Sequence, residues 1–299
     1  MKGYKAAFAV ITAGVLWGMI SFFVRVLSEA GLDALQIAFV RMAVAAPTFT
    51  IAVAVINRKS LKIKLRDVWM FIGMGVVSIV LFNFCYFYTM VHSQTSVAVV
   101  LLYTSPIFIM LLSAVLFREK ITLRKAAALV MTVAGCIFVA GLKGQLNITP
   151  GVFLVGIASG FFYGLYTIFG RYALEKYSPL TVTVYAFIFG LAGSAPISRP
   201  VEVVNIFAQT PVLILWGLGI GIICTVLPYF LYTWGLNRME SGKAAILVAA
   251  EPLVGTVIGM TFWHESHDIM KLAGIGLILA SMIILELPEK KEITSEGKV

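Results

Sequence analysis

Long runs of hydrophobic residues, separated by short polar segments, dominate the sequence. A helix needs about 20 apolar residues to cross a hydrocarbon core about 30 Å thick, and ten runs meet that length. The runs are continuous rather than alternating, which favours membrane helices over a β-barrel. The predicted spans cover residues 6–27, 34–56, 68–90, 96–117, 124–141, 151–170, 180–198, 211–235, 243–263 and 270–286.

The composition supports an all-α integral membrane protein. Charged residues make up 12% of the 299 residues, against about 25% in ordinary soluble domains, which excludes a water-soluble globule. The three cysteines each lie within an apolar run, so no disulfide scaffold is expected. The sequence contains no nucleotide-binding loop and no hydrolase or redox motif. We therefore expect no cofactor and no enzymatic activity, and a gradient rather than ATP as the energy source.

The distribution of basic residues predicts the orientation in the cell membrane. Ten spans place both termini on one side, and 18 of the 23 Lys and Arg residues fall in the segments on that side. Four fall on the other side, and Arg41 lies within a span. Basic loops remain in the cytoplasm, so we predict that both termini are cytoplasmic. Anionic headgroups account for the net charge of +9, so nucleic acid is not needed as a partner.

The two halves of the chain resemble each other when shifted by 146 residues. Pro106 then coincides with Pro252, and Glu119 coincides with Glu265. We predict one repeat at residues 1–146, a second at 147–288 and a cytoplasmic tail at 289–299. Each repeat holds five spans, an odd number, so the second enters the membrane from the opposite side. Such inverted repeats are typical of secondary transporters, whose substrates bind between the halves near the midplane.

These features resemble the EamA-type proteins of the drug/metabolite transporter superfamily, over the chain up to residue 286. The likeness rests on short motifs: Trp17-Gly18, Arg41, Pro106 with Phe117-Arg118-Glu119, and Glu251-Pro252 with Phe262-Trp263-His264-Glu265. The resemblance implies a ten-helix basket with a central cavity lined by spans 1, 3, 4, 6, 8 and 9. It also implies export of amino acids and related metabolites, although uptake members exist.

The chain departs from the family pattern at two places. The position that matches Arg41 in the second repeat is Phe187, so only one repeat carries an arginine there. Small four-span relatives use a glutamate in the first helix for proton coupling, and the first span of this chain has none.

Glu251 and Arg41 are the charged candidates within the membrane, where charges are costly and mark functional sites. Glu251 lies near the middle of the ninth span and is a candidate for proton coupling or for binding a substrate ammonium. Its alternative is a buried neutral carboxyl beside the Pro252 kink. Arg41 lies about 10 Å from the outer end of the second span. It is expected to snorkel or bond to helix carbonyls, with a carboxylate clamp as the second interpretation.

Aromatic and polar side chains deep in the predicted lining spans complete the candidate substrate site. Each needs a hydrogen-bond partner inside the membrane. An aromatic cavity with one acid suits a cation or an apolar amino acid. The predicted substrate-binding residues are Trp17, Asn83, Tyr86, Tyr163, Tyr229 and Glu251.

Three prolines and one short motif add further expectations. Pro106, Pro228 and Pro252 are expected to interrupt lining spans and expose carbonyls to the cavity, or simply to kink the helices. The string HESHD at residues 264–268 has metal-ligating residue types, but it falls in a predicted turn, so no metal site is expected.

The sequence thus favours a secondary transporter for amino acids or related amines, exporting by alternating access and linked to protons. The expected partners are a small-molecule substrate, protons, the lipid bilayer and, as a further candidate, a second copy of the chain. Two alternatives stay open. One is a membrane interaction or scaffold protein that does not transport, and the other is a facilitator or uptake carrier for another solute.

Overall fold

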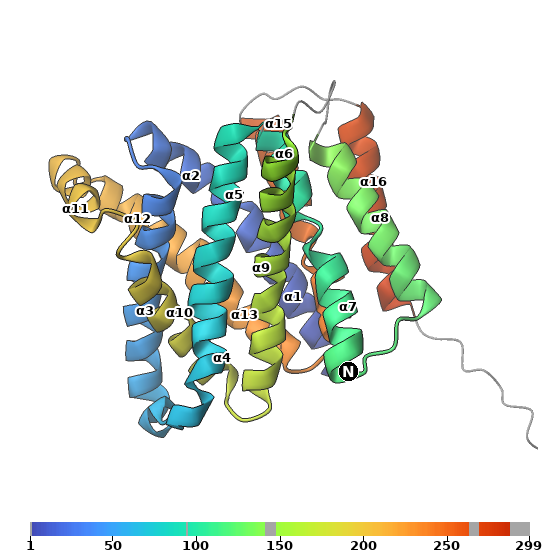
Figure 1. Ribbon diagram of the computed structural model, residues 1–299, viewed down its shortest axis with the longest axis horizontal. Helices are drawn as coiled ribbons and strands as arrows, with labels where there is room; N and C mark the ends of the chain where they lie inside the picture. Colours follow the sequence, from blue (N-terminus) through green and yellow to red (C-terminus); the bar gives the residue numbers. More distant parts are fainter. Residues whose placement is uncertain (1, 94, 141–147, 263–268, 288–299) are drawn as a thin grey trace, which may run out of the picture.

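The computed structural model is a bundle of α-helices that stand side by side (Figure 1). It describes residues 2–93, 95–140, 148–262 and 269–287, and no strand occurs within these ranges. Nine helical segments in this described part are long and apolar enough to cross a membrane. The chain is therefore an all-α, multi-pass membrane protein.

The first half begins with a two-part helix and ends with a helix at the edge of the bundle. Its elements are α1 (Lys2–Gly18), α2 (Ile20–Glu29), α3 (Ala34–Asn57), η1 (Arg58–Leu61), η2 (Leu65–Asp67), α4 (Val68–Ile72), η3 (Gly73–Val80), α5 (Leu81–His92), α6 (Thr95–Leu102), α7 (Ser105–Phe117) and α8 (Leu123–Ala140). η1 and η2 are 3₁₀ turns, whereas η3 is a π-helix inside the third predicted span.

The second half repeats this order and adds one short helix. Its elements are α9 (Pro150–Leu174), α10 (Pro179–Ser194), α11 (Pro200–Gln209), α12 (Leu213–Gly221), η4 (Ile222–Val226), α13 (Leu227–Leu236), α14 (Ser241–Leu247), α15 (Ala250–Phe262) and α16 (Ile269–Glu286). The predicted span 180–198 corresponds to α10, which has 16 residues and is shorter than the nine long segments. α11 was not predicted, because it falls between two spans.

Several helices begin at signals that are visible in the sequence. Asp33 and Gln36 form a capping box at α3, in which each side chain accepts a hydrogen bond from the other residue's backbone N–H at 2.9 Å. α9 and α10 each begin with a proline at the first helical position, after a capping Thr149 and Ser178 respectively. These signals fix where three of the spans start.

Corresponding helices of the two halves make corresponding contacts. α1 packs mainly on α13 and α15 of the second half, while α9 packs mainly on α5, η3, α6 and α7 of the first half. α3 pairs with α10, and α8 pairs with α16 at one side of the bundle (Figure 1). The first helix of each half is therefore embedded among helices of the other half.

Glycines allow the first helix of each half to pack closely against the other half. They lie at two equivalent positions, which are 146 residues apart. A Cβ at Gly14 would lie 2.7 Å from the Val248 carbonyl oxygen, and a Cβ at Gly160 would lie 3.1 Å from the Leu102 carbonyl oxygen. These carbonyls belong to the breaks between α14 and α15 and between α6 and α7. Each glycine thus lets a helix of one half approach the broken span of the other half.

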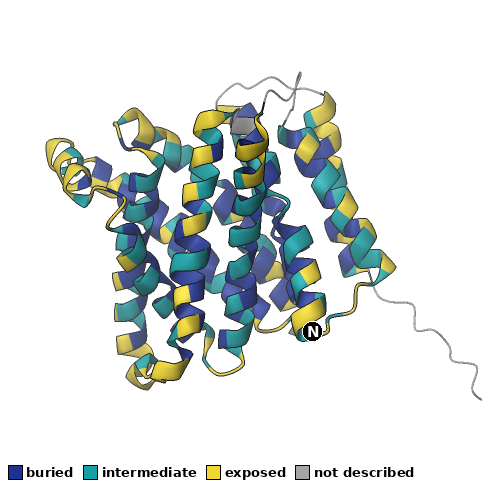
Figure 2. Ribbon diagram, viewed as in Figure 1, coloured by how far each residue is buried: buried dark blue, intermediate teal, exposed yellow. Residues whose placement is uncertain are grey.

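Burial separates an inner side of the bundle from an apolar outer side. Figure 2 shows buried residues turned toward the interior and exposed residues along the outer faces. Large apolar side chains are among the exposed ones, including Val55, which is 80% exposed, and Val115, which is 78% exposed. Lipid tails would cover such side chains, so the outer surface fits a membrane rather than water.

Polar contacts join the two halves at both ends of the bundle. We name the end that carries loops 58–67, 118–122, 175–178 and 237–240 the basic end; the chain also starts there (Figure 1). There Lys176 pairs with Asp67 at 2.6 Å, and Lys125 pairs with Glu240. At the opposite end, Arg199 of the second half pairs with Asp33 of the first half. The halves are therefore tied together above and below the interior.

Candidate functional site

A small cavity lies between the two halves in the interior of the bundle. It offers about 30 Å³ to the centres of water molecules, which is room for about two waters. All six spans that the resemblance implied contribute to its wall. The lining residues are Trp17, Ser78, Ile79, Phe82, Ser105, Ile109, Tyr163, Tyr166, Thr167, Tyr229, Tyr232, Ala245 and Val248. An amino acid does not fit this volume, so the cavity has to expand to bind one.

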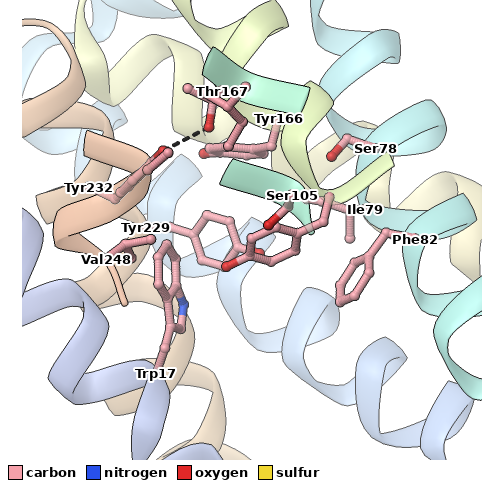
Figure 3. A pocket seen from close by; sticks show the side chains of 13 residues that line it. Trp17, Ser78, Ile79, Phe82, Ser105, Tyr166, Thr167, Tyr229, Tyr232 and Val248 are labelled. Carbon is pink, nitrogen blue, oxygen red and sulfur yellow. Dashed lines mark hydrogen bonds between the residues drawn. The ribbon is translucent and has the colours of Figure 1, made fainter. Parts of the chain in front are cut away.

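Aromatic rings form most of one wall of the cavity (Figure 3). The Trp17 indole of α1 lies edge-on to Tyr229 of α13, with 4.9 Å between ring centroids, and 5.5 Å from the Tyr232 ring. Tyr166 of α9 lies 5.1 Å from Tyr229, also edge-on. These four residues come from both halves, and we name them the aromatic box. Such a set of ring faces attracts cations and apolar rings.

Two of the three tyrosine hydroxyl groups of the aromatic box are paired with threonines. The Tyr232 hydroxyl and Thr167 Oγ1 lie 2.7 Å apart, as drawn in Figure 3, and the Tyr166 hydroxyl lies 3.2 Å from Thr233 Oγ1. A buried hydroxyl inside a membrane protein needs such a partner. The pairs hold both rings in place between α9 and α13.

Glu251 lies beside the cavity, at the break in the ninth predicted span. α14 ends at Leu247, and Glu251 is the second residue of α15, so the carboxyl stands at the middle of the segment Ser241–Phe262. The Tyr163 hydroxyl, which lines the cavity, donates a hydrogen bond to Glu251 Oε2 at 3.3 Å. Glu251 is half-buried. One lining tyrosine thus connects the carboxyl to the cavity.

Arg41 extends from α3 toward the second half rather than toward the membrane surface. Its Nε donates to Thr225 Oγ1 at 3.0 Å, and Thr225 Oγ1 donates to the Ile220 carbonyl oxygen at 2.9 Å. Thr225 lies in the π-helix η4, which leaves carbonyl groups without their usual α-helical partners. The expectation of an outward-snorkelling Arg41 is replaced by this inward contact with a hydroxyl.

The charges of the site occur where the two repeats differ. Glu251 corresponds to Ser105 at the offset of 146 residues, and Arg41 corresponds to Phe187. Ser105 lines the cavity, while Phe187 is fully buried with its ring 4.8 Å from the Tyr229 ring. The acid and the base of the site therefore lie at positions that the other repeat does not match.

The structure brings together four of the six predicted substrate residues. Trp17, Tyr163 and Tyr229 line the cavity, and Glu251 is bonded to Tyr163. Asn83 lies elsewhere: its Nδ2 donates to the Ile79 carbonyl oxygen at 2.6 Å, and it lines a separate pocket beside α10 with Ser194 and Ile197.

Tyr86 is not among the residues of the cavity wall. Its ring lies 6.0 Å from that of Phe82 and 5.4 Å from that of Phe87. Phe82, one helical turn before Tyr86, lines the cavity instead.

The three prolines lie just after irregular backbone rather than at its centre. Pro106 is the second residue of α7 and Pro252 is the third residue of α15, and turns precede them at 103–104 and 248–249. Pro228 follows the π-helix η4 and is the second residue of α13. The breaks in the fourth and ninth predicted spans therefore come before the prolines. The eighth predicted span stays helical through η4.

Sequence analysis did not select Tyr166, Tyr232, Ser78, Phe82 or Ser105 as site residues. Two signals point to some of them. Tyr166 follows Tyr163 by three residues on the same helix face, and Ser105 occupies the repeat position of Glu251. The string HESHD lies outside the described residues. Within the described residues, no cluster of three metal-ligating side chains occurs.

Both halves of the chain match the same family model, that of the EamA-like transporter family, at residues 4–141 and 149–287. A transporter of uncharacterized function from Archaeoglobus fulgidus is 28% identical over 92% of this chain and 94% of its own length. A probable terminal-alkyne amino-acid exporter from Streptantibioticus cattleyicolor is 23% identical over the full length of both chains. A pseudopaline exporter from Pseudomonas aeruginosa is 26% identical over 88% of this chain and 89% of its own.

A solved crystal structure shares the fold. It superposes with a TM-score of 0.77 at 17% identity and covers 95% of this chain and 96% of its own. The named relatives are transporters, which agrees with the expectation of a transporter rather than an enzyme. The match over both halves, together with the helical bundle around a central cavity, shows that the chain belongs to the EamA-like transporter family.

Proposed function

We propose that the protein is a secondary transporter that exports small metabolites, such as amino acids or related amines, by alternating access. One observation carries the proposal: an aromatic cavity lies between the two halves, and a lining tyrosine connects it to the carboxyl of Glu251. Two relatives are named as exporters, one of them for an amino acid, which supports the direction and the substrate class.

Alternating access follows from an inverted pair of five-helix repeats, at residues 1–146 and 147–288, with ten spans in all. The exchanged packing of α1 and α9, and the paired approaches of Gly14 and Gly160, support a two-fold relation between the halves. Such a relation permits two arrangements of the same contacts that are related by the two-fold rotation, one open to each side of the membrane. The tied ends and the small cavity fit a state between these two.

The chemistry of the cavity favours a substrate with an amine. The aromatic box attracts an ammonium group by cation–π interaction, and Tyr163 connects the same cavity to the carboxyl of Glu251. Arg41 offers a guanidinium for a carboxylate, provided its hydrogen bond to Thr225 is exchanged for the substrate. A zwitterionic amino acid meets both the aromatic box and the guanidinium, whereas a simple amine meets only the aromatic box.

Trp17→Ala is expected to weaken substrate binding about tenfold or more, because it removes the indole ring from the aromatic box. Isothermal titration of the purified protein with a substrate would measure this loss. Trp17→Phe keeps a ring and should retain most of the affinity. Equal affinity of Trp17→Ala and the wild type would place the substrate elsewhere.

Cysteine labelling tests the proposed orientation, in which both termini and the basic end face the cytoplasm. Ser60→Cys places a thiol in η1 at that end. The native Cys85, Cys136 and Cys224 are first replaced, so that only position 60 reacts. A membrane-impermeant maleimide should label position 60 in inside-out vesicles but not in intact cells. Labelling in intact cells would reverse the orientation.

Counterflow in liposomes tests the function itself. A thermal-shift screen with amino acids, amines, sugar phosphates and drugs first identifies a ligand, because a ligand that binds the folded state raises its stability. Vesicles loaded with that ligand should then take up its labelled form transiently. A scaffold protein that does not transport would show no counterflow above empty liposomes, and that result would overturn the proposal.

A further inference from the structure

A carboxylate of the first half accepts two hydrogen bonds from the second half at the basic end. Glu119 Oε1 accepts from the Ser241 backbone N–H at 2.8 Å, and Oε2 accepts from the Gly242 N–H at 3.2 Å. These are the first two N–H groups of α14, which have no acceptor within their own helix. Both carboxylate oxygens of Glu119 are therefore used across the boundary between the halves.

The local structure holds Glu119 in this position. Arg118 ends α7 in the left-handed region, with φ of 56°, and the Glu119 N–H returns to the Ser113 carbonyl oxygen at 3.3 Å. Glu119 itself is half-buried, and Lys125 and Glu240 form an ion pair close by in the sequence, again across the two halves. A shielded carboxylate that accepts backbone N–H bonds contributes more than an exposed ion pair.

The contact joins the basic ends of the two broken spans. Glu119 follows α7, whose first residue, Ser105, lines the cavity. On the other side, the seven residues of α14 lead to the break that precedes Glu251. α7 and α14 also pack against each other. The cavity cannot open toward the basic end between these two helices without separating Glu119 from Ser241 and Gly242.

We propose that Glu119 is a positioning residue of the transport cycle, whose bonds to Ser241 and Gly242 keep the cavity closed at the basic end. The bonds form when the cavity faces the opposite side and break when it opens at the basic end. This inference rests on the proposed function, since it assumes alternating access. At the opposite end, the contacts of Arg199 with Asp33 and Glu202 are separate from this closure.

A single cysteine in the cavity measures the accessibility from each side. Ser78→Cys places a small thiol in the cavity wall, in a chain whose three native cysteines have been replaced. A membrane-impermeant maleimide is applied to intact cells and to inside-out vesicles, and the labelling rates are compared without substrate. The Ser60→Cys thiol in the same background identifies which preparation exposes the basic end.

Glu119→Ala should raise the labelling rate from the basic end about tenfold and lower the rate from the opposite side. The removed carboxylate leaves two N–H groups without acceptors only while the basic end is closed, so the open state becomes favoured. Glu175→Gln is the matched control, because Glu175 is an exposed carboxylate at the same end. It should leave both labelling rates unchanged.

Ser241→Pro tests the same bond from its donor side. Proline removes the Ser241 N–H at the first position of α14, where proline suits a helix, and Glu240 already has the extended backbone that a following proline requires. The Ser241 hydroxyl has no hydrogen-bond partner, so its removal costs no bond. Ser241→Pro should shift labelling in the same direction as Glu119→Ala. The double variant should be labelled from the basic end faster than Glu119→Ala. The added increase should be smaller than the increase that Ser241→Pro causes on its own.

The outcomes separate this inference from the proposed function. Unchanged labelling from both sides in Glu119→Ala, or equal increases from both sides, would overturn the closure role of Glu119 and leave a purely structural contact. A wild-type cavity that is labelled from one side only, with or without ligand, would overturn alternating access itself. If Glu119→Ala does not fold, Glu119→Gln and Ser241→Pro each remove one bond and provide the same comparison.

Discussion

Glu251→Gln is expected to abolish transport driven by a pH gradient while leaving substrate exchange largely intact. Glutamine keeps the volume of the side chain and still accepts a hydrogen bond from Tyr163, but it cannot bind or release a proton. A coupling ion must bind the two access states with different affinity, and Glu251 is the acid beside the cavity at mid-span. Closing the cavity removes water from the carboxyl and favours its neutral form, whereas opening permits ionisation.

Proteoliposomes with and without a pH gradient separate these two activities. Gradient-driven accumulation of labelled substrate by Glu251→Gln should fall to the level seen without a gradient, and exchange of internal for external substrate should continue. Glu29→Gln, an exposed carboxylate paired with Arg25 within α2, should behave as wild type. Full accumulation by Glu251→Gln would exclude Glu251 as the coupling residue. Loss of exchange for cationic substrates alone would make it a substrate anchor.

Gly14→Leu is expected to destabilise the protein by about 3 kcal/mol, the upper end of typical overpacking costs. A Cβ at this position would lie 2.7 Å from the Val248 carbonyl oxygen and 3.0 Å from the Ala250 Cβ. The carbonyl belongs to the turn before Glu251, so it cannot move away without disturbing both the break and the site. Gly160→Leu should have a comparable effect at the equivalent contact of the other half.

Thermal unfolding in detergent, followed by the fraction of protein that stays monodisperse, measures this loss. Gly276→Leu is the matched control, because a Cβ at Gly276 in α16 meets no atom within 4 Å. Its unfolding temperature should stay close to that of the wild type. Equal unfolding temperatures for Gly14→Leu and Gly276→Leu would show that α1 does not need the close approach.

The membrane spans could be predicted from the sequence because their length is set by the thickness of the bilayer. Pro106 and Pro252 predicted interruptions of the fourth and ninth spans, but not that the turns at 103–104 and 248–249 come before the prolines. α11 was missed because it is a short helix in a segment that no membrane-length criterion selects. Length thus predicts where the chain crosses, and packing between the halves determines where helices stop.

Three of the predicted site residues were selected as aromatic side chains deep in their spans. Trp17, Tyr163 and Tyr229 all lie in the cavity wall. In the third span the depth of a residue did not show which face of α5 turns toward the cavity. Phe82 lines the cavity, while Asn83 lines another pocket. The hydrogen bond of Arg41 to Thr225 joins residues 184 positions apart, which no local pattern reveals.

The exchange of first helices between the halves also has a consequence for synthesis. Trp17 packs against Tyr229, which the ribosome adds 212 residues later. At about 5–20 residues per second, α1 spends about 10–40 s in the membrane before its partner α13 exists. Throughout that interval its inward face meets lipid or the insertion machinery instead of the aromatic box. The first half therefore lacks the partner surface of its inward face until the second half is made, and we expect a separately synthesised second half to supply that surface.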